Sequence, residues 1–282
     1  MTAHKPYQLL DSGNRRRLEL CGEHRLTRPA PQALWRPGLG EEEWRSDAEY
    51  IRSSSGGGDW RGKLPDEWRV AYEGFELLAR PTGFGHLGIF GEQAGSWSWI
   101  EEICRRSTEP LEVLNLFAYT GGATMAAARG GARVCHVDAS AGVVTWARGN
   151  AAANGLDEAP IRWICEEATK FCARELRRER SYDLIVLDPP SFGRGPKGEV
   201  FKIEQHLPPL LEACAELLGP KARGVLLSAH SPGFSPKVLV ALVDEMRGER
   251  AGALHAEEMV LDAAPGGRSL PSGARACWRA DS

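Results

Sequence analysis

Hydrophobic and polar residues follow two different patterns along the chain, and the pattern changes near residue 95. Before it, short alternations such as Leu18-Glu19-Leu20 and His24-Arg25-Leu26 predict short strands. Turns are expected between them, at Asp11-Ser12-Gly13-Asn14 and at Cys21-Gly22. We therefore predict a small β-rich N-terminal region over residues 1–95, in which we expect a substrate-recognition or lid element.

Residues 96–282 alternate short apolar runs with longer amphipathic stretches. The apolar runs predict strands at Leu111–Phe117, Arg133–Val137, Ile161–Cys165, Leu184–Leu187, Gly224–Ser228, Ala256–Leu261 and Ala274–Arg279. The amphipathic stretches predict helices at Ala123–Arg129, Ala141–Asn154, Glu167–Arg178, Gln205–Leu218 and Pro236–Glu249. This alternation is typical of an α/β fold, a doubly wound parallel sheet that binds ligands at the carboxyl ends of its strands. The loop between the last two strands is too short for a crossover helix, so one of the seven strands should run antiparallel at that edge.

Composition is that of an ordinary globular protein. The 282 residues are 42% hydrophobic and 26% charged, which suits one large domain or a catalytic domain with a small appendage. The formal net charge of −3 lacks the positive excess of a dedicated nucleic-acid binder, although a local basic patch is compatible with it. The sequence contains no long apolar run, and its first residues lack the apolar stretch of a signal peptide. We expect a soluble, cytoplasmic protein.

Cysteine and histidine spacing points away from disulfides and metals. The seven cysteines are an odd number and none forms a C-x-x-C pair, while no H-E-x-x-H occurs among the seven histidines. We expect reduced thiols and no catalytic metal.

Two loops after predicted strands carry candidate ligand-binding chemistry. After the first strand, Gly121-Gly122 opens a helix where a ligand can approach the backbone without meeting a Cβ atom. Asp138 ends the second strand, about twenty residues further on, where a carboxylate can accept hydrogen bonds from ribose hydroxyls. The G-x-G-x-x-G motif of nicotinamide-binding folds is missing here. The glycine pair alone is equally explained by a plain turn.

The segment Leu187-Asp188-Pro189-Pro190-Ser191-Phe192 follows the fourth predicted strand. Two consecutive prolines stiffen the backbone and remove two amide donors. At the carboxyl end of a strand this makes a rigid platform of hydrogen-bond acceptors beside an aromatic ring.

These motifs together resemble class I S-adenosylmethionine (SAM)-dependent methyltransferases, specifically the group of the large-subunit ribosomal RNA methyltransferases I and K. The resemblance covers residues 75–282. It is carried by Val113–Gly121, Val137-Asp138-Ala139-Ser140, Asp188–Phe192 and the upstream Gly85–Gln93, which resembles the segment lying against the cofactor in that group. The resemblance implies a Rossmann-like fold, SAM as cofactor and a role in rRNA processing.

The resemblance also implies which residues hold the cofactor. The methionine end is assigned to the loop residues Phe117, Ala118, Tyr119, Thr120 and Gly121. It implies that Asp138, with the next residue Ala139, binds the ribose. Glu167, with the next residue Ala168, is implied to bind the adenine amino group, and Gln93 is implied to contact the cofactor from the lid side. Two alternatives stay open: Glu167 as an acid favoured by the dipole of the following helix, and Gln93 as an ordinary surface glutamine.

Acceptor chemistry is assigned to Asp188, Pro189, Pro190, Phe192 and His230. The Asp188 carboxylate and the Pro189 carbonyl can accept amino protons of a nitrogen acceptor, and Phe192 can stack on a planar base. His230 can take up a proton near neutral pH. Phe192 packed under its own loop and His230 capping its loop are the structural alternatives.

Methylation at carbon 5 of cytosine requires a thiolate that adds at carbon 6. Related cytosine enzymes carry that cysteine just after the fifth strand, where this chain has Leu227-Ser228-Ala229-His230-Ser231. Nitrogen is therefore the favoured acceptor atom.

Ribosomal RNA is the partner implied by the resemblance. Arg194, Lys197 and Lys202 near the platform, and the Arg15-Arg16-Arg17 run, supply basic residues that can contact phosphates, although short basic runs are also common in solvated turns. We expect no membrane partner. A protein or small-molecule acceptor, and a catalytically inactive cofactor-binding module, stay open as alternatives.

Overall fold

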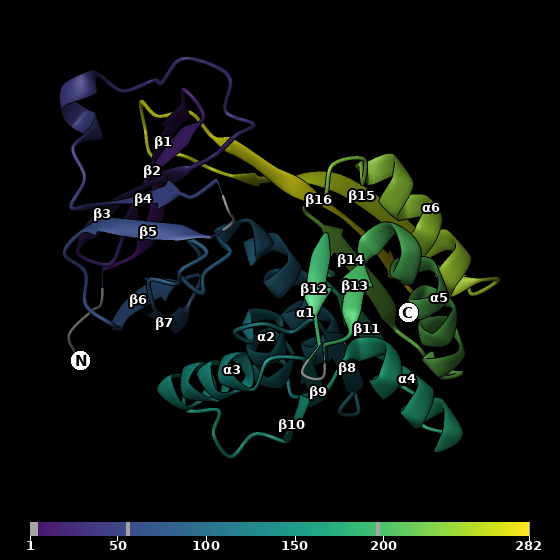
Figure 1. Ribbon diagram of the computed structural model, residues 1–282. Coiled ribbons are helices and arrows are strands. Elements are labelled where there is room, and N and C mark those ends of the chain that lie inside the picture. Colours follow the sequence, from purple (N-terminus) through teal and green to yellow (C-terminus); the bar gives the residue numbers. More distant parts are fainter. Residues whose placement is uncertain (1–4, 55–56, 196–197, 282) are drawn as a thin grey trace. The chain divides into compact units, whose positions relative to one another are not determined.

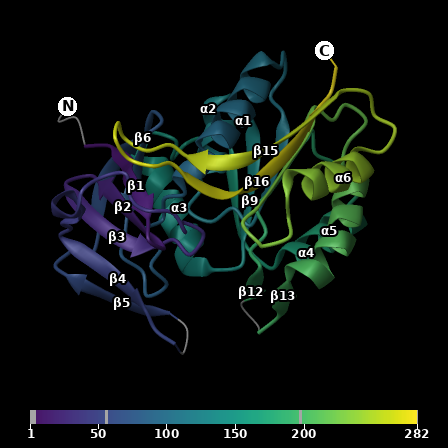
Figure 2. The same ribbon diagram turned by 90° about the horizontal axis from the view of Figure 1, so that it is seen from above.

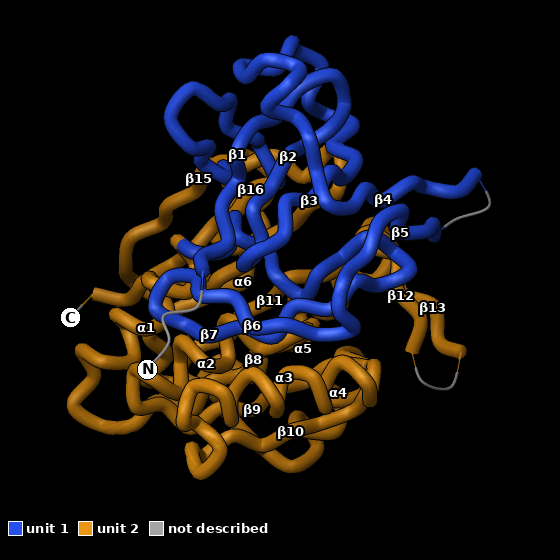
Figure 3. Tube along the Cα trace, turned by 90° about the vertical axis from the view of Figure 1, so that its left-hand side faces the viewer, with its two compact units in different colours: residues 1–94, 260–272 blue, residues 95–259, 273–282 orange. Residues whose placement is uncertain are grey.

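The computed structural model describes residues 5–54, 57–195 and 198–281. The chain divides into two compact units, which are described separately (Figure 3). The first contains residues 1–94 and 260–272, and the second contains residues 95–259 and 273–282. Within the described part of the chain, no helix is long and apolar enough to cross a membrane, and no cluster of three or more His, Cys, Asp or Glu is arranged to hold a metal ion.

The first unit is built from β-strands, as its sequence pattern predicts. A five-stranded sheet has the order β1-β2-β3-β4-β5, from strands Tyr7–Gly13, Arg16–Cys21, His24–Pro29, Ala48–Arg52 and Gly58–Gly62. Its β3–β4 pair is parallel and the other pairs are antiparallel. The hairpin of β6 (Trp68–Tyr72) and β7 (Phe75–Ala79) and two 3₁₀ turns, η1 (Glu41–Trp44) and η2 (Gly91–Gln93), complete the unit. β1 extends through Gly13, so the first turn lies at Asn14 and Arg15, both with positive φ.

A buried ion pair holds strands of this sheet together. Arg28 on β3 donates to both carboxylate oxygens of Glu19 on β2, each at 2.6 Å, and the Tyr7 hydroxyl donates to Glu19 at 2.5 Å. Burial raises the pKa of the Glu19 carboxyl, but the guanidinium groups of Arg17 and Arg28 outweigh it and lower that pKa to about 2. The ionised pair is therefore an integral part of the core of the unit.

Asp11 connects distant segments of the first unit. Its fully buried carboxylate accepts hydrogen bonds from the backbone N–H groups of Gly38, Leu39 and Arg268 and from the indole N–H of Trp44, at 2.8–3.1 Å. Arg268 follows Asp11 by 257 residues, so this side chain fixes residues 260–272 within the unit.

The second unit contains a seven-stranded mixed sheet of the expected doubly wound type. Its order is β10-β9-β8-β11-β14-β16-β15. The strands are β8 (Glu112–Leu116), β9 (Arg133–Asp138), β10 (Ile161–Cys165), β11 (Leu184–Leu187), β14 (Gly224–Ala229), β15 (Ala253–Leu261) and β16 (Leu270–Arg279). The first five run parallel, whereas β16 is antiparallel to β14 and lies next to the edge strand β15. The predicted antiparallel strand is thereby confirmed.

Helices cover both faces of this sheet (Figures 1 and 2). They are α1 (Ala94–Arg106), α2 (Gly122–Arg129), α3 (Ala141–Ala153), α4 (Ala168–Arg177), α5 (Ile203–Leu217) and α6 (Pro236–Arg247). α4, α5 and α6 pack on one face around buried residues such as Phe171, Leu210 and Val243. α1, α2 and α3 lie on the other face.

Two elements of the second unit were not predicted. α1 contains Gly95, Ser96 and Ser98, which are weak helix formers, and the helix is stabilised by packing instead: the ring of Trp97 occupies the space beside Gly122. The short hairpin of β12 (Phe192–Arg194) and β13 (Val200–Lys202) contains only three residues in each strand, too few for a periodic pattern.

Candidate active site

Residues singled out from the sequence gather at one edge of the second unit's sheet. The parallel strands end in register, because Leu116 of β8 pairs with Val137 of β9 and with Leu187 of β11, and Leu187 pairs with Leu227 of β14. The candidate residues follow these ends directly: Phe117 after β8, Asp138 at the end of β9, Glu167 after β10, Asp188 after β11 and His230 after β14. The carboxyl edge therefore brings together the predicted cofactor and acceptor residues.

The loop after β8 has an unusual backbone. Phe117 and Tyr119 adopt positive φ values of 55° and 47°, which bulky residues rarely do, and Gly121 follows at 89°. The amide of Ala118 donates to the Val137 carbonyl at 3.1 Å, and Thr120 is buried. Strain of this kind concentrates at functional sites, where the surrounding structure maintains it.

The fold requires the two glycines of this loop for different reasons. Gly121 needs its positive φ to begin α2. A Cβ atom on Gly122 would lie 2.4 Å from the ring of Trp97, so its missing side chain makes room for α1. The packing of α1 therefore explains Gly122, and no ligand is needed to account for it.

Asp138 holds the loop after β8 in place. One carboxylate oxygen accepts from the amide of Tyr119 at 3.0 Å, and the other accepts from the amide of Ser140 at 2.9 Å. Burial raises the pKa of Asp138 above its ordinary value, although these two hydrogen bonds act in the opposite direction. The ionised carboxylate is therefore poorly solvated and gains from additional hydrogen-bond donors.

Glu167 is the N-cap of α4. Its two carboxylate oxygens accept from the amides of Thr169 and Lys170 at 3.0 and 2.9 Å. Glu167 therefore has the structural role that the sequence left open, an acid at the start of a helix. Each oxygen of an ionised carboxylate can accept more than one hydrogen bond, so capping leaves further acceptor capacity.

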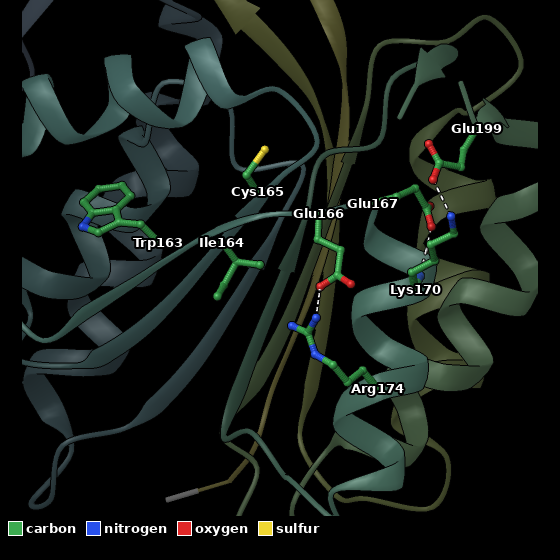
Figure 4. Close-up of a pocket in the computed structure, with 8 residues that line it drawn as sticks. All are labelled: Trp163, Ile164, Cys165, Glu166, Glu167, Lys170, Arg174 and Glu199. Atoms are coloured by element: carbon green, nitrogen blue, oxygen red, sulfur yellow. Dashed lines mark hydrogen bonds and ion pairs between the residues drawn. The ribbon is translucent and has the colours of Figure 1, made fainter. Parts of the chain in front are cut away.

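A pocket of about 410 Å³ opens at the carboxyl end of β10 (Figure 4). Its lining comes from β10, α4 and the turn before β13: Trp163, Ile164, Cys165, Glu166, Glu167, Lys170, Arg174 and Glu199. Ion pairs join Lys170 to Glu199 and Arg174 to Glu166 across it (Figure 4). The thiol of Cys165 points to the Ala139 carbonyl at 3.6 Å, so the pocket adjoins the loop of Asp138.

The Asp188 carboxylate is fixed by a residue that the sequence analysis did not single out. The hydroxyl of Ser228, at the end of β14, donates to Asp188 Oδ1 at 2.7 Å. Nε2 of His230 lies 3.6 Å from the same oxygen, and the Asp188 side chain is 32% exposed. A second bridge, between the hydroxyls of Ser191 and Ser231 at 2.6 Å, joins the same two loops. The sequence could have pointed to Ser228, because it is a polar residue at the end of a strand that is otherwise apolar.

The remaining platform residues differ in exposure. Pro189 is buried and Pro190 is exposed. Phe192 lies on β12 with 52% of its surface exposed, so it is not packed under its own loop, and the Arg194 guanidinium lies 5.8 Å from its ring centre. Lys202 is the N-cap residue of α5, and Lys197 lies outside the described residues.

Other predicted residues belong to the first unit or serve the fold. Gln93 belongs to η2 of the first unit, so its assignment to the cofactor stays a prediction. Ala168 is the first residue of α4 and is buried in the core. In the basic run, Arg17 faces the buried Glu19 at 3.5 Å and Arg16 lies over the Trp44 ring, so both have structural contacts.

The cysteines bear on the acceptor chemistry. The structure describes all seven, and six are buried. The exposed one, Cys165, ends β10 rather than β11 or β14. No cysteine stands in the loop after β11, which contains Asp188, or in the loop after β14.

Comparison with known proteins identifies the family. The S-adenosylmethionine-dependent methyltransferase family matches residues 55–266, about three quarters of the chain. The chain belongs to this family. SAM is therefore its cofactor, and the carboxyl edge is where a sheet of this type binds one.

Curated relatives of this methyltransferase include ribosomal RNA enzymes. The ribosomal RNA large subunit methyltransferase K/L of Methylococcus capsulatus is 40% identical over 178 residues, which are 62% of this chain and 22% of that protein. The large subunit methyltransferase I of Aeromonas hydrophila is 34% identical over 181 residues, 63% of this chain and 44% of that protein. The matches thus span less than half the length of these relatives.

Solved structures share the fold. A SAM-dependent methyltransferase from Agrobacterium tumefaciens is 42% identical, with a TM-score of 0.91 over 97% of this chain and 90% of that one. The SMU.776 structure, complexed with S-adenosylhomocysteine (SAH), is 18% identical, with a TM-score of 0.74 over 97% and 75%. The second likeness concerns the fold alone.

Proposed function

We propose that this methyltransferase modifies a nucleobase nitrogen in ribosomal RNA. The observation that carries the proposal is the Asp188 carboxylate, held by Ser228 beside His230 at the carboxyl edge of the sheet. The names of the relatives, which are ribosomal RNA large subunit methyltransferases, support the choice of RNA.

The loops after β8 and β9 fit the methionine and ribose ends of SAM. The strained turn from Phe117 to Gly121 directs its backbone to the edge of the sheet, and Asp138 is a poorly solvated carboxylate next to it. Ribose hydroxyls are the donors that such a carboxylate lacks. We assign Asp138 to the ribose and the turn to the methionine end.

The pocket at the end of β10 fits the adenine. It adjoins Ala139, and Glu167 stands at its rim with both oxygens oriented by the first turn of α4. The exocyclic amino group of adenine is a donor that this fixed carboxylate can accept. Capping a helix and binding adenine are therefore compatible roles for Glu167.

When bound, SAM supplies a methyl group already activated by a positively charged sulfur. The protein must hold the acceptor nitrogen in line with that methyl group and take up the proton that the nitrogen loses. Asp188 and the Pro189 carbonyl accept hydrogen bonds from the amino group and so orient its lone pair. Transfer would break the sulfur–methyl bond, leave SAH, and form the N–CH₃ bond. The proton released by the nitrogen would pass to Asp188 or to His230, whose Nε2 lies 3.6 Å from Asp188 Oδ1.

Phe192 is assigned to stacking on the acceptor base, because it is half exposed and follows Asp188 by four residues in the chain. Base–aromatic stacking contributes about 1–3 kcal/mol per base. Carbon-5 methylation of cytosine is disfavoured, since the stretch after β14, where the nucleophilic cysteine is expected, contains no cysteine.

Transfer of a labelled methyl group tests the proposal. The purified protein is incubated with labelled SAM and with either ribosomal RNA or a low-molecular-weight cell extract. We expect label in RNA, released by hydrolysis as an N-methylated base. Label only in the small-molecule fraction, or in neither, contradicts it.

A further inference from the structure

Phe84 stands out in the first unit because its side chain is 76% exposed. Within the described part of the chain this is the most exposed large hydrophobic side chain. A loop segment, Thr82 to His86, presents it. Exposing a phenylalanine forgoes about 1.5–3 kcal/mol of burial, so this ring contributes little to the stability of the unit.

The loop that carries Phe84 is held on both sides of the ring. The carbonyl of Gly83 accepts from the amide of Gly58 at 3.0 Å and from the hydroxyl of Tyr50 at 2.9 Å. The carbonyl of Thr82 accepts from the indole N–H of Trp60 at 3.0 Å. These donors belong to β4 and β5, so the sheet fixes the loop on the N-terminal side of Phe84.

On the other side, the carbonyl of Gly85 accepts from Arg28 at 2.8 Å. Arg28 is the buried guanidinium paired with Glu19, one of the most constrained side chains of the unit. The loop therefore does not turn Phe84 inward to bury it, because each neighbouring peptide is already tied to the sheet.

The two glycines beside Phe84 differ in what the fold requires. Gly85 has φ of +77°, and a Cβ atom there would lie 2.5 Å from the ring of Tyr50. Gly83 has no such restriction: it lacks a positive φ, and a Cβ atom on it would meet nothing within 4 Å. Folding thus does not explain Gly83. A substitution at Gly83, the residue before Phe84, is therefore compatible with the fold.

A cation stands on the strand pair that holds this loop. Arg52, which is exposed, pairs in register with Gly58, the residue whose amide bonds Gly83. It is two residues from Tyr50 on β4 and hence on the same face of the strand, the face from which Tyr50 reaches the loop. The sheet and the loop bonded to it thus present an exposed cation and an exposed aromatic ring.

We propose that Phe84 is a stacking site for an unpaired RNA base, with Arg52 contacting an adjoining phosphate. The inference rests on the proposed RNA substrate. Single-stranded RNA is recognised by aromatic rings that stack on bases and by cations that hold the backbone. A protein partner is disfavoured, because such interfaces need a broad apolar surface, whereas Phe84 is flanked by two glycines.

The test is binding of a fluorescein-labelled single-stranded 12-nucleotide RNA, followed by anisotropy in the presence of SAH. Phe84→Ser should weaken binding about tenfold, as expected for one lost stack, and Phe84→Trp should retain wild-type affinity. Gly83→Val places a branched side chain next to Phe84 in the chain and should also weaken binding, while thermal stability stays unchanged. Leu34→Ser, at another exposed apolar residue of the same unit (69%), is the matched control and should bind normally.

Equal RNA affinity of Phe84→Ser and the wild type overturns the inference. Loss of SAH affinity in Phe84→Ser also overturns it, because the ring would then contact the cofactor. If RNA binding depends on Phe84 but no methyl group is transferred to RNA, the proposed function fails and the stacking site stands. If RNA is methylated equally by both proteins, the proposed function stands and the stacking site fails.

Discussion

Replacing Asp138 with alanine removes a carboxylate that orders the loop after β8 and, in our proposal, binds the ribose. The side chain accepts two backbone hydrogen bonds, from Tyr119 at 3.0 Å and Ser140 at 2.9 Å. A hydrogen bond to a charged group contributes about 1.5–3 kcal/mol. Losing the contact to ribose should therefore weaken SAH binding by about 10- to 150-fold.

Isothermal titration calorimetry with SAH measures this loss. The matched control is Asp157→Ala, which removes an exposed aspartate from the turn between α3 and β10 and should leave the affinity unchanged. Circular dichroism of both variants checks that the fold is retained. An Asp138→Ala variant that is folded and binds SAH like the wild type would refute the assignment of Asp138 to the cofactor.

The pH dependence of SAH binding gives a second readout on the same residue. Burial raises the pKa of Asp138 above its ordinary value of 3.8. The ionised form is the one that accepts both ribose hydroxyls, so affinity should fall as the pH drops through this raised pKa. We expect the midpoint of the fall above pH 3.8 in the wild type and no such step in Asp138→Ala. A wild-type affinity that stays constant down to pH 3.8 argues against this role.

Four further predictions concern other residues. Asp188→Ala should leave the Kd for SAH within about twofold and lower methyl transfer by about 10²-fold or more, whereas loss of SAH binding with an unchanged rate contradicts its role. Ser228→Ala should lower kcat about tenfold at unchanged SAH affinity, and Ser228→Thr, which keeps the hydroxyl, should restore it; equal rates in both variants contradict positioning by Ser228. Glu19→Gln should lower the free energy of unfolding by about 3–5 kcal/mol, because it leaves Arg28 buried without its charged partner. The wild-type free energy of unfolding should fall as the pH drops from 4.5 to about 2, and chemical denaturation measures both effects. Gly273→Ala should cost about 1–3 kcal/mol, because its Cβ atom would lie 2.6 Å from a carbonyl of β14; an unchanged unfolding midpoint contradicts the close approach.

Short-range patterns predicted the second unit well. The strand Leu184–Leu187 has the expected bounds, since a fully buried strand is a continuous apolar run bounded by polar residues. α5 begins at Ile203, two residues before the expected start, because Lys202 takes the N-cap position without a capping side chain. Candidate residues at strand ends were brought together because parallel strands share one carboxyl edge.

Long-range contacts explain what the sequence did not reveal. The hydrogen bond from Ser228 to Asp188 depends on β14 lying next to β11, which no local pattern encodes. The same is true of Asp11 and Arg268, which are 257 residues apart. The pocket at the end of β10 requires Glu199, from a turn whose three-residue strands leave no periodic signal.

Mass mapping of ribosomal RNA tests the central claim most directly. RNA is compared from cells that lack this gene and carry either the wild-type protein or Asp188→Ala. The account predicts one nucleobase that is methylated at nitrogen with the wild type and unmethylated with Asp188→Ala. An identical set of methylated bases in the two samples would contradict it.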